Sequence, residues 1–128
     1  MLTTIETQVP TTKRAPALAR RAVDSLEVHL KPQQLGDVRL IVSELVANVV
    51  KHSGKAPEET VDVEVTVAPD VVRGSICDIG EWLPDPELVE EPQEGRAEAF
   101  GLFLVDQLST RWGIQRETPT CVWFEMAC

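Results

Sequence analysis

Three polar side chains recur at four-residue spacing in residues 40–54, an apolar stretch with the sequence LIVSELVANVVKHSG. On a helix, Glu44, Asn48 and His52 would form a row along one side, at the border of the apolar face. An amide oxygen such as that of Asn48 is a hard ligand that suits Mg²⁺. A carboxylate one turn earlier, that of Glu44, can accept a proton from an attacking hydroxyl or water. The same spacing is also typical of a solvated helix face, so both interpretations stay open on spacing alone.

Two other segments and one lysine could act on the same ligand. Asp78 ends an apolar strand-like run and is closely followed by Gly80. Its carboxylate can face a donor such as an adenine amino group, while the glycine lets a ligand approach the backbone. Gly101 and Leu102 begin a helical pattern, and the unpaired amides at a helix N-terminus suit a phosphate. Lys51 can reach a phosphate oxygen. The plainer interpretations are a strand-end turn, a helix cap and an exposed lysine.

Hydrophobic spacing predicts the elements that would position these groups. A central helix is expected from Asp37, as its N-cap, to a terminator at Gly54. An amphipathic helix precedes it, from residue 13 to about residue 29, and stops at Pro32. Residues 61–67 alternate strictly between apolar and polar side chains, and together with residues 71–79 they predict an antiparallel hairpin.

A third helix and a second strand pair complete the pattern. Residues 100–108 have helical spacing, residues 111–116 and 121–126 form the strand pair, and residues 2–9 are a candidate edge strand. Strands in adjacent pairs with grouped helices predict an α+β fold, a two-layer sandwich with helices on one face of a mixed, mostly antiparallel sheet. The chain of 128 residues is expected to be one domain, 1–128.

Charge and composition exclude several function classes. The 12 basic and 21 acidic residues give a formal net charge of −9, which disfavours binding to nucleic acid or to an anionic membrane surface. No apolar run approaches a membrane span, and the N-terminus lacks the features of a signal peptide. Cys77, Cys121 and Cys128 lack metal-ligand spacing. Reduced thiols in a cytoplasmic protein are therefore expected, with Cys77 and Cys121 as small core residues.

Taken together, the motifs resemble the GHKL (Bergerat) ATPase superfamily, and more closely its anti-sigma factor serine/threonine kinase branch. Residues 43–52 (SELVANVVKH) are similar to the N box, and residues 78–80 (DIG) to the start of the G1 box. Residues 101–113 (GLFLVDQLSTRWG) are similar to the second glycine box and the strand after it, and residues 122–125 (VWFE) to the closing strand. The resemblance spans residues 9–126.

The resemblance implies a domain that binds ATP between its helices and its sheet. It implies that Asn48 holds Mg²⁺, that Glu44 is the general base and that Asp78 binds the adenine. Four more residues would line the nucleotide or contact a phosphate: Gly80, Gly101, Leu102 and Lys51. The resemblance also implies phosphorylation of a serine or threonine on an antagonist (anti-anti-sigma) protein and sequestration of a sigma factor. Phosphoryl transfer of this kind relies on positioning and metal electrostatics.

The sequence departs from the family pattern near the expected nucleotide. Trp82 and Ala99 stand where glycines are common, Phe100 follows Ala99, and residues 119–121 (PTC) replace a Gly-Lys-Thr-like stretch. Residues 85–98 are acidic and nearly free of basic side chains. Added Cβ atoms reduce the room for a ligand beside the backbone, and an acidic segment repels a phosphate at short range.

These departures leave a second function open beside the kinase. The alternative is a protein-binding regulatory module with weak or no nucleotide binding. The oligomeric state is also open, and a homodimer is one candidate. Leu40 and Ala47 lie off the apolar stripe of the central helix, where they can contact a partner or pack under the preceding helix.

Overall fold

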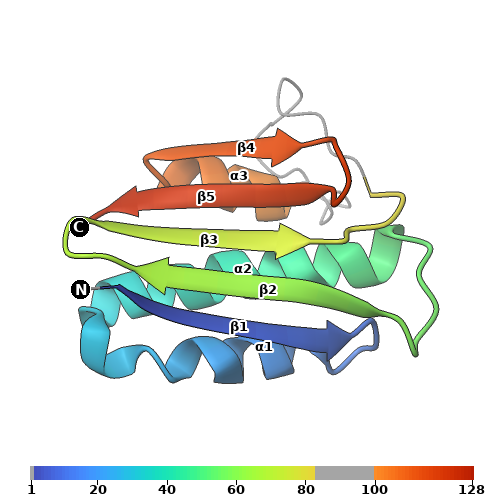
Figure 1. The fold of residues 1–128 in the computed structure, drawn as a ribbon, viewed down its shortest axis with the longest axis horizontal. Coiled ribbons are helices and arrows are strands. Elements are labelled where there is room, and N and C mark those ends of the chain that lie inside the picture. Colours follow the sequence, from blue (N-terminus) through green and yellow to red (C-terminus); the bar gives the residue numbers. More distant parts are fainter. Residues whose placement is uncertain (1, 83–99) are drawn as a thin grey trace.

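In the residues that the structure describes, 2–82 and 100–128, three α-helices cover one face of a five-stranded sheet (Figure 1). The structure is a computed structural model. Its strand order is β1-β2-β3-β5-β4, and every described pairing is antiparallel. The expected two-layer α+β fold is confirmed, whereas the assignment of residues 1–128 to one domain stays a prediction.

In chain order the elements are β1 (Thr3–Pro10), α1 (Ala15–Asp24), a short 3₁₀ helix (Glu27–His29), α2 (Pro32–His52), β2 (Thr60–Val67), β3 (Val71–Cys77), α3 (Phe100–Leu108), β4 (Arg111–Gln115) and β5 (Cys121–Ala127).

The longest helix, α2, begins earlier than the sequence predicted. Pro32 is its first residue, because a fixed φ and a missing N–H suit the first turn of a helix. The Lys31 N–H donates to the Gln34 side-chain oxygen at 3.0 Å and closes this end of the helix. Asp37 therefore lies inside α2 and is not its N-cap. The prediction for the preceding helix was also too long, since α1 ends at Asp24.

The core lies between the helices and the inner face of the sheet. The alternating valines of β2 are buried, as the sequence predicted, and they face the buried stripe of α2. On β3, Gly74 is the cross-strand partner of Phe124, the largest fully buried side chain. A Cβ at Gly74 would overlap the Phe124 ring, so a glycine is required there for the ring to lie across the strand.

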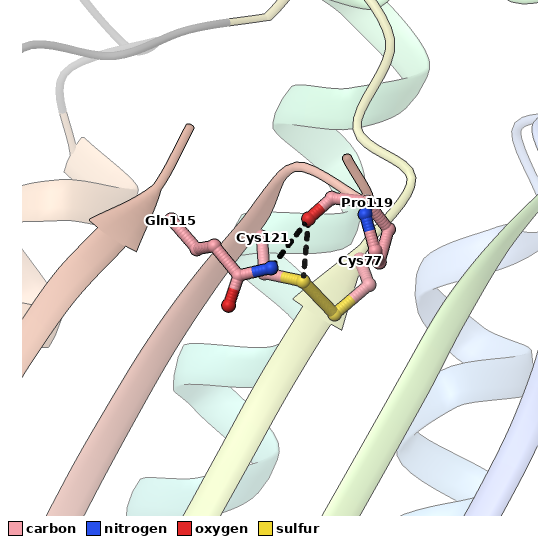
Figure 2. Close-up of a disulfide and its surroundings, with 4 residues drawn as sticks. All are labelled: Cys77, Gln115, Pro119 and Cys121. Atoms are coloured by element: carbon pink, nitrogen blue, oxygen red, sulfur yellow. Dashed lines mark hydrogen bonds between the residues drawn. A yellow bond between two sulfur atoms is a disulfide. The ribbon is translucent and has the colours of Figure 1, made fainter. Parts of the chain in front are cut away.

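The β3–β5 pairing also places two cysteines opposite each other at one end of the sheet (Figure 2). Cys77 and Cys121 have Cα atoms 4.1 Å apart, and their sulfurs form a disulfide. The expectation of reduced core thiols is therefore wrong for this pair. Among the described residues, Cys128 is the free cysteine. Reduced thiols at this pair therefore no longer support a cytoplasmic location, and that location stays a prediction. Separately, none of the described helices is long and apolar enough to cross a bilayer.

Candidate functional site

The predicted polar row lies on α2, and its three side chains differ in exposure. Glu44 is half-buried, Asn48 is only 3% exposed, and His52 is exposed. Among the described residues, the Asn48 side-chain nitrogen has no hydrogen-bond partner. A buried amide without a partner is uncommon, because leaving it unpaired costs about 1–3 kcal/mol. Since the two ends of a carboxamide exchange by a flip of the side chain, Asn48 can present either its nitrogen or its oxygen to a ligand.

Asp78 lies in the loop that follows β3, and a lysine that the sequence analysis did not single out holds it. The Lys55 ammonium forms an ion pair with the Asp78 carboxylate at 2.8 Å and donates to the Asp78 backbone oxygen at 2.9 Å. It also donates to the Thr60 backbone oxygen at 2.5 Å. The Lys55 side chain is only 6% exposed, whereas that of Asp78 is 61% exposed. No local spacing predicts this pair, because 23 residues separate Lys55 from Asp78 in the chain.

The same loop, residues 78–82, is fastened to the C-terminal end of α2. The Glu81 N–H donates to the Ser53 backbone oxygen at 2.8 Å. Gly80 has a φ of +62° and lies so close to Ser53 that an added Cβ would come within 2.5 Å of its backbone oxygen. Trp82, at a position where the GHKL resemblance leads us to expect a glycine, is a buried core residue. The segments that carry Asn48 and Asp78 therefore meet at one end of the molecule (Figure 1).

The remaining predicted residues lie at the end of α2 and at the start of α3. Lys51 is exposed on the last turn of α2. Gly101 and Leu102 lie in the first turn of α3, as predicted, and the Leu102 side chain is part of the core. The helix α3 packs against α2. The acidic segment 85–98 and the departure at Ala99 lie outside the described residues.

A groove with a volume of about 470 Å³ lies at the other end of the molecule. The start of β1, the N-terminal end of α2 and the β2–β3 turn form its walls, and none of the predicted site residues contributes to it. The 21 residues of α2 span about 30 Å, so this groove is remote from the end where Asp78 lies. Within the described residues, no cluster of three or more His, Cys, Asp or Glu side chains forms a metal site. A Mg²⁺ ion that accompanies a nucleotide does not need one, because one or two protein oxygens and the phosphates suffice.

Comparisons with known proteins agree with this fold. A family model described as the histidine kinase-like ATPase domain matches residues 9–126. Among solved structures, a chain of the SiaB–SiaC complex from Pseudomonas aeruginosa matches with a TM-score of 0.59 and 14% sequence identity, covering 97% of this chain and 89% of that chain. At that identity the likeness shows the fold alone. No curated protein matches the sequence.

Proposed function

Since this chain belongs to the histidine kinase-like ATPase domain family, we propose that it is a regulatory protein that binds ATP with Mg²⁺ and acts on other proteins. Family membership confirms the resemblance to the GHKL superfamily, and members of that superfamily are ATPase-like domains. The finer proposal is a serine/threonine kinase that phosphorylates an antagonist protein, sequesters a sigma factor, or does both. The nucleotide would bind at the end of the molecule where α2 and the loop 78–82 meet.

The observation that carries this proposal is the buried side-chain amide of Asn48, whose nitrogen has no hydrogen-bond partner among the residues that the structure describes. An amide oxygen fits the preference of Mg²⁺ for hard oxygen ligands, and a nucleotide supplies the other ligands through its phosphates. Asn48 lies about one turn of helix before Ser53, the residue on which the loop 78–82 is fastened. Asn48 and Asp78 would thus contact different parts of one elongated ligand.

Each predicted residue has a part in this proposal. Asn48 would hold the metal, and Glu44, one turn earlier and half-buried, would accept the proton of the attacking hydroxyl. Asp78 would accept a hydrogen bond from the adenine amino group. The four others would line the nucleotide or contact a phosphate: Gly80, Lys51, Gly101 and Leu102. When bound, ATP supplies the phosphoryl group and Mg²⁺ neutralises the charge that develops on it.

Calorimetry with Mg-ATP on the wild type and on Asn48→Ala tests the nucleotide part. The wild type should bind, and Asn48→Ala should bind at least about 10-fold more weakly, because a charge-assisted contact is worth about 1.5–3 kcal/mol. Gln33→Ala is the matched control, since it removes an exposed amide from the other end of α2. Absence of binding by the wild type, or equal binding by Asn48→Ala, would contradict the proposal.

One observation favours the second candidate function, a protein-binding module with weak or no nucleotide binding. Trp82 is buried where the GHKL resemblance leads us to expect a glycine. Incubation with a candidate antagonist protein and ATP labelled on its γ-phosphate separates the two functions. Transfer of label to the antagonist supports the kinase, whereas a stable complex formed without transfer supports the module.

Protein partners are part of both proposals. One solved structure with a similar fold is itself a complex of two proteins, SiaB and SiaC. Leu40 on α2 is 39% exposed, so it is available to a sigma factor, to an antagonist protein or to a second copy of the chain. Light scattering on the purified protein, before and after Leu40→Lys, tests the homodimer.

A further inference from the structure

We propose that Lys55 is a positioning residue that fixes the carboxylate of Asp78 for recognition of an amino-substituted purine. This inference rests on the proposed nucleotide binding and deepens it, because it names the residue that sets the choice of base. Neither composition nor motif spacing points to Lys55, which follows the α2 terminator in a polar loop. The structure brings its ammonium to Asp78 from a different segment of the chain.

All three protons of the Lys55 ammonium have acceptors. They go to the Thr60 backbone oxygen, the Asp78 backbone oxygen and the Asp78 Oδ2 atom. The backbone of Lys55 is also fixed, since its N–H donates to the Ser53 hydroxyl at 3.1 Å. The Lys55 side chain is only 6% exposed and donates three hydrogen bonds. It is therefore held in one conformation, unlike an exposed lysine, whose stem is flexible.

The backbone of Asp78 is held by contacts on both its oxygen and its nitrogen. Its φ is +64°, in the left-handed region that glycine favours and that Asp adopts more often than most other residues. Lys55 donates to the Asp78 backbone oxygen. The Asp78 N–H donates to the backbone oxygen of Thr120 at 2.8 Å, and Thr120 precedes Cys121 of the disulfide.

In this arrangement the Asp78 carboxylate can still accept a hydrogen bond from a ligand. Oδ2 is held by Lys55, and the side chain as a whole is 61% exposed. An ionised carboxylate accepts hydrogen bonds at both of its oxygens, so it can accept one from the 6-amino group of adenine. It repels the 6-oxo group of guanine. Lys55 has no proton left to offer that oxo group. The pair therefore selects a base with an amino donor at C6.

Binding of two nucleotides tests this inference. ATP and purine riboside 5′-triphosphate differ only in the 6-amino group, and each is titrated with Mg²⁺ into the wild type, Lys55→Met and Lys13→Met. Lys13→Met is the matched control, because it removes an exposed lysine before α1. The wild type and Lys13→Met should bind ATP about 10- to 100-fold more tightly than the analogue, the range expected for one hydrogen bond to a charged group. In Lys55→Met this preference should fall to about threefold or less.

The ratio of the two affinities distinguishes positioning from a merely structural role. If Lys55→Met weakens both ligands equally and keeps the wild-type ratio, Lys55 only supports the loop and the inference is overturned. A wild type that binds both ligands equally also overturns it, while nucleotide binding itself survives. A wild type that binds neither ligand refutes the proposed function and the inference with it.

Folding of the variant is controlled separately. Methionine keeps the apolar stem of the buried lysine, and thermal unfolding shows whether Lys55→Met is folded at the temperature of the titration. If it is not, Lys55→Gln replaces it, because its amide still donates to the two backbone oxygens but carries no charge for the carboxylate. The same loss of preference is expected from Lys55→Gln, and an unchanged preference overturns the inference.

Discussion

Replacing Gly80 by alanine tests how the loop 78–82 is fastened to α2. Gly80 has a φ of +62°, and a non-glycine residue in this region costs roughly 1–2 kcal/mol. The new Cβ would also come within 2.5 Å of the Ser53 backbone oxygen. Because that oxygen belongs to the backbone, the loop has to move away and lose the Glu81 N–H···O bond to Ser53, which is worth about 0.5–1.5 kcal/mol. Together these effects should lower the free energy of unfolding by about 1.5–3.5 kcal/mol.

Gly36→Ala is the matched control for this change. Gly36 is an exposed residue within α2, and no atom lies within 4 Å of the position of a Cβ there. The same chemical change should therefore stabilise the protein by about 0.5–1 kcal/mol, the usual gain from alanine over glycine inside a helix. The two substitutions thus have opposite expected signs, although each adds one methyl group.

Equilibrium unfolding in urea, followed by tryptophan fluorescence, measures both variants. Trp82 is a buried residue of the altered loop itself, and it contributes to the signal together with Trp112 and Trp123. A domain of this size commonly has 5–15 kcal/mol of stability, so Gly80→Ala should remain folded without denaturant. If its free energy of unfolding lies within about 0.5 kcal/mol of the wild type, as for an ordinary surface substitution, the loop 78–82 does not pack on Ser53 through Gly80 and Glu81.

Two further predictions concern Asn48 and the cysteines. Asn48→Leu keeps the number of side-chain heavy atoms and removes a buried amide nitrogen that has no hydrogen-bond partner among the described residues, so the free energy of unfolding should rise by about 1 kcal/mol or stay unchanged; a clear fall in urea unfolding would show that the amide is paired in the free protein. The Cys77–Cys121 disulfide predicts that an alkylating reagent adds to the exposed Cys128 alone in the unreduced, denatured chain, and to all three cysteines after reduction. Intact mass spectrometry counts the added groups, and three additions without reduction would show that the disulfide does not form.

Much of the fold follows from local patterns in the sequence. The alternation of residues 61–67 and the helical spacing around Asn48 place β2 and α2 correctly, because burial on one face imposes a period of 2 on strands and of 3.6 on helices. The predicted start of α2 is wrong because Pro32 does not only end the preceding helical pattern but also suits the first turn of the next helix. The row of Glu44 and Asn48 is likewise local, since residues four apart on a helix share a side.

Two contacts between distant residues follow only from the tertiary structure, through strand register and loop packing. Only the β3–β5 pairing shows that Cys77 and Cys121 face each other, 44 residues apart in sequence. Only the packing of the loop 78–82 on α2 gives Asp78 its buried partner in Lys55. Residue types and spacing determined which side chains were capable of chemistry. Which of them meet is decided by contacts between distant segments, whose geometry no local period encodes.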